Sequence, residues 1–202
     1  MGNKSTKLFI FATSSQRRID LIKNIYLNKI IFVQHCFDEK KFEIKNIKQL
    51  KILARKKAES IEKKYVDAVI ISADTAVFCG GRFLGKPLEK QEAKKHLKMI
   101  SGKNVLVATA VFIKDLKSNK KTSFVEKTIV KFRKLSKEEI NWYISTNEWK
   151  SKAGSFAIQG KGKVFIEKIF GDYFNVVGIP ICRLTKELRK FGLDYSYDKR
   201  TV

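Results

Sequence analysis

Apolar residues along this chain follow two alternating patterns, which predict strands and helices in turn. Short apolar runs between polar turns are typical of buried strands, whereas apolar positions three and four residues apart indicate one buried face of a helix. The first pattern predicts extended segments at residues 8–12, 30–36, 68–78, 82–84, 105–113, 124–132 and 164–169. The second predicts helices from about residue 16 and at about 48–64, 89–100, 136–146 and 180–192. This alternation favours an α/β fold.

Turn and capping residues agree with these boundaries. Gly80 and Gly81 stand between two extended segments, as in a tight hairpin. Ser136 and Glu139 have the spacing of a capping box at the start of a helix. We therefore expect a hairpin after residue 79 and a helix start at residue 136.

The composition predicts one globular domain. Of 202 residues, 44% are hydrophobic and 15 are Phe, which is enough to bury a substantial core. We expect a single domain over residues 1–193, with a polar tail at 194–202.

The sequence further predicts a cytoplasmic protein without a membrane span. No apolar run reaches the roughly 18 residues that a spanning helix needs, and the first apolar stretch is too short for a secretory signal. The cysteines Cys36, Cys79 and Cys182 are odd in number and far apart, which is typical of reduced thiols. His35 and His96 have no partner at metal-ligand spacing and are expected to be structural or surface residues.

The charge favours anionic partners. The formal net charge is +23, from 43 Lys and Arg against 20 Asp and Glu. The lysines are spread along nearly every segment, whereas a dedicated nucleic-acid surface would concentrate them with interleaved aromatic residues. Solvated helix faces explain this spread better than a nucleic-acid interface, and the charge by itself does not choose between nucleotide and nucleic acid.

A strand, a hydroxyl-rich turn and a helix start meet near the N-terminus, with Ser14, Ser15, Arg17 and Arg18 in the turn. The first turn of a helix has unpaired N–H groups and the positive end of the helix dipole, and arginine forks fit phosphate oxygens. This corner predicts a phosphate cradle. Ordinary serine capping and solvated arginines are the alternative.

Two charged residues fall where the pattern requires apolar ones. Lys57 lies on the apolar stripe of its helix, four residues after Leu53, and must either extend to solvent or meet an anion. Asp74 interrupts an apolar strand, so it should bind a metal, pair with a cation or end the strand at a cleft. Together with Asp38 or Glu39, Asp74 could hold Mg²⁺ shared with phosphate oxygens.

Two further polar residues are candidates for binding. Gly85 and Pro87 flank Lys86 and would present its ammonium group at a fixed place, unless the segment is an ordinary surface loop. Gln159 offers a neutral donor and acceptor in the glycine-rich loop at 154–162, where it could also be a simple turn residue.

Taken together, these segments resemble the Maf family of nucleoside triphosphate pyrophosphatases. The matching motifs, in family order, are Ser14-Ser15-Gln16-Arg17-Arg18, Leu53-Ala54-Arg55-Lys56-Lys57-Ala58, Ala73-Asp74-Thr75, Leu84-Gly85-Lys86-Pro87, Ser101-Gly102-Lys103, Thr109-Ala110-Val111, Ala153-Gly154, Ile158-Gln159-Gly160 and Asn175-Val176-Val177-Gly178-Ile179-Pro180. The resemblance covers about residues 8–192. It implies a mixed α/β fold with an elongated, strongly twisted mixed sheet flanked by helices, two lobes around a central cleft as in inosine triphosphate pyrophosphatase, and commonly a homodimer.

The resemblance also implies roles for individual residues. Asp74 corresponds to the catalytic aspartate, and Glu39 with Asp74 would hold a divalent cation, Mg²⁺ or Mn²⁺. Asp38 and Glu43 remain rivals of Glu39, because the acidic turn at 37–43 departs from the family pattern. The residues expected to bind substrate are Ser14, Arg17, Arg18, Lys57, Thr75, Lys86 and Gln159. Gln16 replaces the usual proline of the first motif, which loosens the turn.

The implied reaction is metal-assisted attack of water on the α-phosphorus, releasing a nucleoside monophosphate and pyrophosphate in a nucleotide-pool house-cleaning role. Thr75 and Gln159 match the family branch that hydrolyses dTTP and UTP, whereas the branch acting on 7-methyl-GTP usually has glutamine and glutamate there. The alternative is a catalytically silent protein of the same fold that binds nucleic acid or regulates division.

Overall fold

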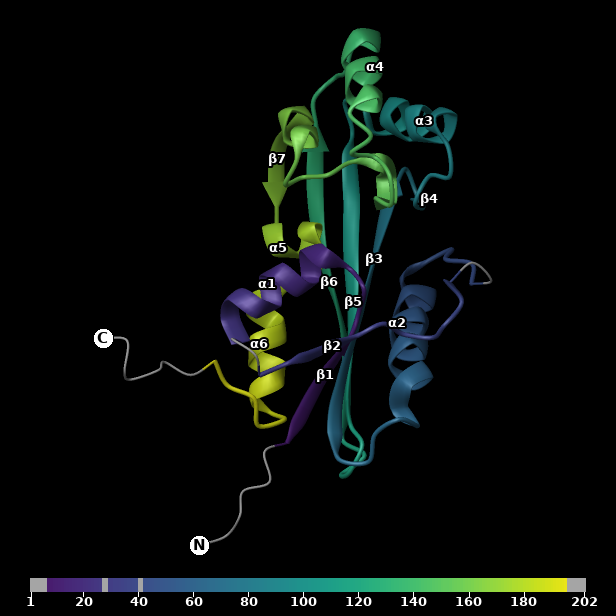
Figure 1. The fold of residues 1–202 in the computed structure, drawn as a ribbon. Coiled ribbons are helices and arrows are strands. Elements are labelled where there is room, and N and C mark those ends of the chain that lie inside the picture. The colour runs from purple at the N-terminus through teal and green to yellow at the C-terminus, as the bar shows by residue number, and fades with distance from the viewer. Residues whose placement is uncertain (1–6, 27–28, 40–41, 196–202) are drawn as a thin grey trace, which may run out of the picture.

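The fold is a seven-stranded mixed sheet with helices on both faces (Figure 1). It is seen in a computed structural model that describes residues 7–26, 29–39 and 42–195. The strands are β1 (Leu8–Ala12), β2 (Ile31–Val33), β3 (Ala68–Cys79), β4 (Arg82–Leu84), β5 (Asn104–Asp115), β6 (Lys121–Phe132) and β7 (Ile166–Phe170). The α-helices are α1 (Gln16–Tyr26), α2 (Ile47–Glu62), α3 (Lys90–Ile100), α4 (Lys137–Ser145), α5 (Tyr173–Val177) and α6 (Ile181–Arg189), with 3-10 turns η2 (Ala153–Ser155) and η3 (Lys161–Phe165). The mixed α/β prediction is confirmed.

The sheet has the order β2-β1-β3-β5-β6-β7, and β4 pairs with β3. β1 lies parallel to β2 and β3, and the other pairs are antiparallel. The long strands β3, β5 and β6 run the length of the molecule, with α3 and α4 at one end and α1, α2 and α6 at the other (Figure 1). The molecule is therefore elongated along these strands and has two ends with separate helical covers.

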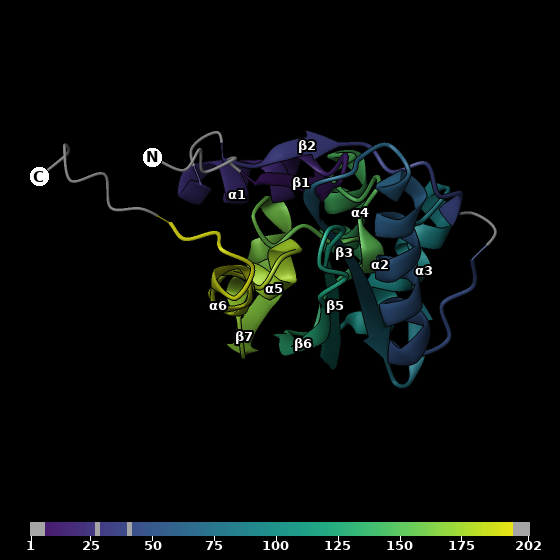
Figure 2. The same ribbon diagram turned by 90° about the horizontal axis from the view of Figure 1, so that it is seen from below.

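The two faces of β3 are covered by different helices, because successive side chains of a strand point to opposite faces. Val69 and Ile71 pack in the apolar cluster with α1 and α6, whereas Ile70 and Ala76 pack in the cluster with α2. Seen from below, α1 and α6 lie on one side of the sheet and α2 on the other (Figure 2). This alternation decides which helices each polar residue of β3 faces.

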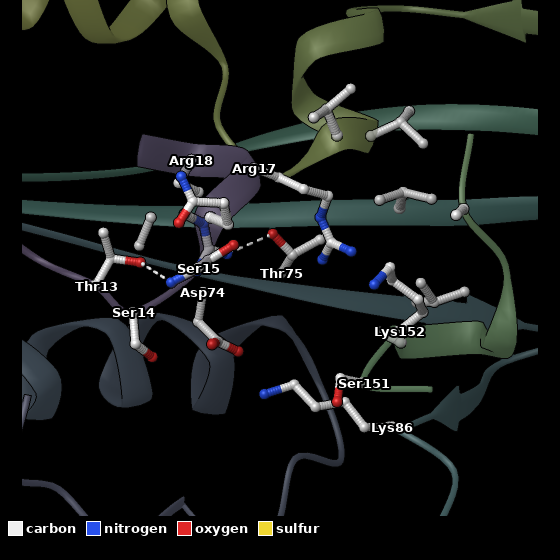
Figure 3. A pocket seen from close by; sticks show the side chains of 18 of the residues that line it. Thr13, Ser14, Ser15, Arg17, Arg18, Asp74, Thr75, Lys86, Ser151 and Lys152 are labelled. Atoms are coloured by element: carbon white, nitrogen blue, oxygen red, sulfur yellow. Dashed lines mark hydrogen bonds between the residues drawn. The ribbon is translucent and has the colours of Figure 1, made fainter. Parts of the chain in front are cut away.

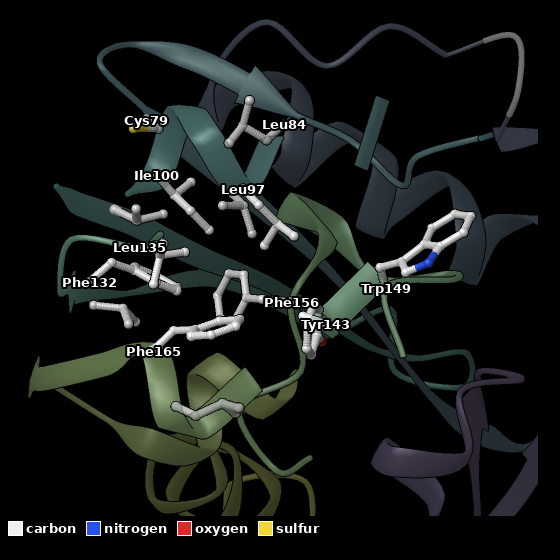
Figure 4. Packing of buried hydrophobic residues seen from close by; sticks show 14 of the residues in the cluster. Cys79, Leu84, Leu97, Ile100, Phe132, Leu135, Tyr143, Trp149, Phe156 and Phe165 are labelled. Carbon is white, nitrogen blue, oxygen red and sulfur yellow. The ribbon is translucent and has the colours of Figure 1, made fainter. Parts of the chain in front are cut away.

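A third apolar cluster fills the other end of the molecule. There α3, α4 and the segment around η2 pack on the far parts of β3, β5 and β6, and Figure 4 shows the aromatic rings at the centre of this packing. The ring centroids of Phe132 and Phe156 are 4.9 Å apart in an edge-to-face arrangement, and those of Tyr143 and Phe165 are 5.3 Å apart. The cluster anchors the loop after α4, which carries Phe156, to the sheet.

Several local predictions are confirmed. Gly80 and Gly81 both have positive φ, 56° and 76°, in the hairpin between β3 and β4. Ser136 and Glu139 form the predicted capping box at the start of α4. The last predicted helix is α6, which follows Pro180 and ends before Gly192, where φ is 92°.

Other local predictions are wrong in detail. Only Ile31–Val33 of the segment 30–36 is a strand, and the strand expected at 164–169 begins at Ile166, after the 3-10 turn η3. The short helix α5 was not predicted, because five residues are too few to show a helical period. The Asp172 side chain accepts a hydrogen bond from the backbone of Phe174 at its start, and Gly178 ends it.

The described residues contain no helix that is long and apolar enough to cross a membrane. The predicted tail at 194–202 begins with Asp194, which accepts a hydrogen bond from Arg189 at 2.9 Å. Residues 196–202 and 1–6, which the predicted domain boundaries also include, lie outside the described part of the chain.

Candidate active site

A cleft of about 710 Å³ opens between the two ends of the molecule. Its walls come from the β1–α1 turn, α2, the middle of β3, the segment after β4, the loop at 151–160 and α5. Every predicted site residue lines it: Ser14, Arg17, Arg18, Glu39, Lys57, Asp74, Thr75, Lys86 and Gln159. Residues up to 145 positions apart in the chain thus meet in one place.

The β1–α1 turn brings hydroxyl and guanidinium groups to one end of the cleft (Figure 3). Ser14 is exposed, and the Thr13 hydroxyl accepts a hydrogen bond from the Ser15 N–H at 3.1 Å. Thr13 thus supports the turn, whereas sequence reasoning considered only Ser14 and Ser15 there. The Gln16 side chain donates to Asp20 at 2.6 Å, one turn further along α1.

The two arginines of this turn have different surroundings. Arg18 is buried, and its guanidinium donates to the Gly178 carbonyl at 2.7 Å and to the Thr75 hydroxyl at 2.8 Å. Arg17 is half-buried beside the cleft, and burial together with the charge of Arg18 lowers its pKa. Arg18 therefore holds the turn against β3 and α5. Arg17 Nε has no hydrogen-bond partner among the described residues, so Arg17 can meet a ligand.

A buried lysine and two carboxylates form the floor of the cleft. Lys57 on α2 is only 3% exposed, and its ammonium group donates to Asp74 and lies 2.8 Å from Glu39. The interpretation that Lys57 extends to solvent is therefore wrong, and it meets two anions. Asp74 is also no strand end, because β3 continues to Cys79 and pairs Asp74 with Ala110 of β5.

Glu39 is surrounded by further positive or hydrogen-bonding groups. His35 Nε2 lies 3.0 Å from Glu39, and the exposed Lys86 lies 3.4 Å from it. The hydrogen bond from His35 and the charges of Lys57 and Lys86 hold the pKa of Glu39 well below its usual range, although partial burial acts in the opposite direction. Glu39 is thus ionised at neutral pH.

The carboxylates fit a divalent cation that is shared with a phosphate. One ammonium nitrogen, of Lys57, contacts both Glu39 and Asp74, so both carboxylates are near enough to bind one ion. Within the described ranges, no group of three or more His, Cys, Asp and Glu side chains forms a complete protein cage for a metal. Mg²⁺ typically takes one or two carboxylates plus substrate phosphates and water, which is the set this cleft would supply.

The rival carboxylates lie elsewhere. Glu43 is exposed and pairs with Lys45 at 3.0 Å, and Asp38 is exposed beside the cleft-lining Glu39. Among the three acidic residues considered for this position, the geometry brings Glu39 to Asp74.

Behind the cleft, a chain of buried polar groups supports Arg18. The Thr75 and Thr109 hydroxyls are 2.9 Å apart, and Thr109 donates to the Asn175 carbonyl at 3.0 Å. The Asn175 side-chain amide donates to the Val107 carbonyl at 3.1 Å and to the Thr128 hydroxyl at 2.9 Å. These bonds connect β3, β5, β6 and α5 behind the site, and they explain why polar residues occupy these apolar strands.

The opposite wall is the loop that contains η2. Ser151 and Lys152 line the cleft from this loop (Figure 3). The exposed Gln159 lines it as well. Sequence reasoning missed Ser151, Lys152 and also His35, which it took for a structural or surface residue. The position of Lys152 directly before the Ala153-Gly154 motif and that of His35 four residues before Glu39 were the available signals.

The family profile described as "Maf-like protein" matches residues 8–191. The chain belongs to the Maf family. Relatives of this Maf protein include one from Methanosarcina barkeri, 41% identical over 91% of this chain and 94% of its own length, and one from Carboxydothermus hydrogenoformans, 42% identical over 90% and 97%. A relative from Pyrococcus horikoshii is 40% identical over 92% and 97%. All of these relatives are named dTTP/UTP pyrophosphatase.

Among solved structures, the Staphylococcus aureus Ham1 protein is similar to 62% of this chain and 72% of its own, with 12% identity and a TM-score of 0.42. That partial similarity is too low to assign the fold by itself.

Proposed function

We propose that this Maf protein hydrolyses dTTP and UTP to the nucleoside monophosphate and pyrophosphate. The relatives that carry the name dTTP/UTP pyrophosphatase match it over nine-tenths of its length. The observation that carries the proposal is the set of Glu39, Lys57 and Asp74 at the floor of a cleft whose rim is cationic. This set combines carboxylates for a metal with cations for a triphosphate.

The residues of the chain act mainly by neutralising and positioning charge, as phosphoryl transfer requires. Arg17, Lys57 and Lys86 bind phosphate oxygens and offset the charge that develops as the bond breaks. The oxygen of a water molecule forms a bond to the α-phosphorus, and the bond from this phosphorus to the oxygen that bridges the α- and β-phosphates breaks. Pyrophosphate leaves with that oxygen.

Asp74 orients the attacking water and accepts its proton, which requires hydrogen-bond reach to that water. Lys57 contacts Asp74 and keeps the carboxylate in place. Glu39 and Asp74 would hold Mg²⁺ or Mn²⁺, which supplies Lewis-acid stabilisation of the phosphate oxygens when bound.

Selection of the pyrimidine base is assigned to Gln159, whose side chain is exposed at the cleft wall, together with Thr75. The Thr75 hydroxyl already accepts a hydrogen bond from Arg18 and lies next to Thr109, so its position is well defined. A pocket that hydrogen-bonds a base rejects analogues lacking the matching groups.

The test is a substrate panel for the wild type, Asp74→Asn and a matched control, Asp67→Asn. Asp67 is an exposed aspartate that pairs with Lys117 at 3.0 Å and does not line the cleft. Pyrophosphate and monophosphate are measured separately with ribo-, deoxyribo- and modified triphosphates and Mg²⁺ or Mn²⁺. We expect pyrophosphate from dTTP or UTP, at least 100-fold less with Asp74→Asn, and wild-type rates with Asp67→Asn.

Release of orthophosphate would contradict the proposal, as would near-normal turnover by a folded Asp74→Asn protein. No product from any substrate, together with RNA binding that weakens steeply with salt, would favour the nucleic-acid-binding alternative, with which the net charge of +23 is compatible.

A homodimer and a cytoplasmic location stay predictions. The family resemblance supports the dimer. The three widely separated cysteines, Cys36, Cys79 and Cys182, support the location. Sedimentation of the purified protein tests the dimer, and cell fractionation tests the location.

A further inference from the structure

Lys152 extends into the cleft toward Arg17 from the opposite wall (Figure 3). Arg17 comes from the β1–α1 turn, and Lys152 comes from the loop before η2, 135 positions later in the chain. Burial and the nearby positive charge of Arg17 lower the pKa of Lys152. Two like charges therefore approach each other in a partly desolvated place, which is unfavourable unless an anion lies between them.

The carboxylates of the cleft do not balance this pair. Glu39 and Asp74 are engaged by Lys57, Lys86 and His35. In the part of the chain that the structure describes, Arg17 Nε is buried without a hydrogen-bond partner. A buried donor without an acceptor costs free energy, so this donor is suited to an incoming oxygen.

Among the described residues, the Lys152 side chain likewise makes a weak contact. Its ammonium group lies 3.4 Å from the Lys150 carbonyl, a long hydrogen bond. Glu148 acts on Lys152 through its charge, but a Glu148 oxygen already accepts the backbone N–H of Lys161 at 2.7 Å. The cation is thus available for a stronger anionic partner.

The backbone holds Lys152 in this position. Its N–H donates to the Trp149 carbonyl at 3.2 Å, and its carbonyl accepts the Ser155 N–H at 3.0 Å. The following turn is held to the segment after β4 by a hydrogen bond of 3.1 Å from the Gly154 N–H to the Gly85 carbonyl. Ser151 has a φ of 57°, a strained backbone that persists only where the surrounding structure enforces it.

We propose that Lys152 and Arg17 form a clamp that binds the phosphate chain of the substrate from opposite walls of the cleft. The ligand class is a polyphosphate anion, free or as part of a nucleotide. That the natural ligand is a nucleoside triphosphate rests on the proposed function. The clamp adds Lys152 to the substrate-binding residues. An anion bound between the two walls would also offset the repulsion between the two cations.

The first experiment measures binding of inorganic tripolyphosphate by calorimetry at low salt to the wild type, Lys152→Met, Lys152→Arg and Lys163→Met. Lys163→Met is the matched control, because Lys163 is an exposed lysine of η3 whose side chain is not among those that line the cleft. We expect about 10-fold or greater loss of affinity for Lys152→Met, as for a lost hydrogen bond between charged groups. Lys152→Arg should keep most of the affinity, and Lys163→Met should bind like the wild type.

The second experiment reads Lys152 directly. Reductive methylation at about pH 8, followed by peptide mass spectrometry, compares Lys152 with Lys163 with and without tripolyphosphate. A lysine with a lowered pKa has more neutral amine and should react faster, and tripolyphosphate should protect Lys152 but not Lys163. Because this readout needs no variant, a folding defect cannot imitate it.

The outcomes separate failure of the clamp from failure of the proposed function. Wild-type affinity in a folded Lys152→Met protein, lack of protection of Lys152, or no tripolyphosphate binding by the wild type would overturn it, even if nucleotides are hydrolysed. Conversely, a protein that hydrolyses no nucleotide but loses tripolyphosphate binding with Lys152→Met would contradict the proposed function and support the clamp.

Discussion

Glu39 shows how a partly exposed carboxylate is adapted to its site. Its side chain is 30% exposed, yet it contacts His35, Lys57 and Lys86 at once. Each contact favours the ionised form, so the folded protein binds a proton at this position less readily than the unfolded chain does. The same negative charge that would hold a cation therefore also contributes to folding stability.

The pH dependence of stability follows from that difference. Because the pKa of Glu39 is lowered on folding, its contribution is fully present above its unfolded value, about 4.3, and is lost as the pH falls toward the folded value. We expect wild type to be more stable than Glu39→Gln at pH 7 and the difference to shrink below about pH 4. Thermal unfolding of both proteins between pH 3 and pH 7 measures this.

Glu43→Gln is the control, because Glu43 is exposed and pairs only with the exposed Lys45 among the described residues. Its difference from the wild type should stay small at every pH. A Glu39→Gln difference that does not change with pH would contradict the assignment.

Among the elements, the loop around η2 determines the shape of the cleft wall. Gly154 has a φ of 67°, and a Cβ at this position would lie 2.8 Å from Val77 Cγ1 on β3. Only glycine allows the loop to approach the strand this closely. The residues on either side of Gly154, from Ser151 to Gly160, line the cleft or support its wall, so the packing here sets where Lys152 and Gln159 lie.

Gly154→Ala should therefore destabilise the protein more than alanine at a glycine that has a similar φ but open space around the added Cβ. Gly102 has a φ of 68°, but its nearest neighbour to an added Cβ is at 4.0 Å. We expect Gly102→Ala to cost about 1 kcal/mol of unfolding free energy from backbone strain, and Gly154→Ala at least 1 kcal/mol more from overpacking, by rough estimate. Urea unfolding gives both values, and steady-state kinetics should show a raised KM for Gly154→Ala only.

Equal destabilisation by the two substitutions would mean that the loop moves away from β3 without cost. In that case the close approach of Gly154 to Val77 would not fix the cleft wall.

The whole molecule carries a net charge of +23, far more than its cleft can account for. Such a charge raises the positive potential around the protein and attracts polyanions before they contact the site. Salt screens this attraction over about 10 Å at 0.1 M ionic strength, but it acts less on buried pairs such as Lys57 and Asp74. Attraction of the substrate and chemistry in the cleft should thus respond differently to salt.

We expect the KM for dTTP to rise several-fold between about 50 and 500 mM salt, while kcat changes little. Initial rates at saturating divalent metal measure both constants. A parallel series in which sucrose replaces the salt controls for effects of added solute that do not depend on charge. A kcat that falls with salt while KM stays constant would show that the net charge has no role in substrate capture.

Sequence alone determined the type and order of most elements, and each site residue that it predicted lines the cleft, although further lining residues such as Lys152 were missed. Strand and helix periods, and cap residues such as Ser136, depend on neighbours close in the chain and can therefore be recognised in the sequence. The site residues could be predicted because the family motifs occur in their usual order. The short helix α5 was missed because five residues are too few to show a helical period, and the start of β7 was misplaced because the 3-10 turn η3 before it has no such period.

The tertiary structure decided which groups meet. Alternation along β3 directs Asp74 to α2 and Lys57, and Thr75 to the other face and Arg18. The fold also brings His35 to Glu39 and Lys152 toward Arg17. Except for the pair His35 and Glu39, which are four positions apart, these contacts depend on strand pairing and loop packing between residues far apart in the chain, which no local pattern records.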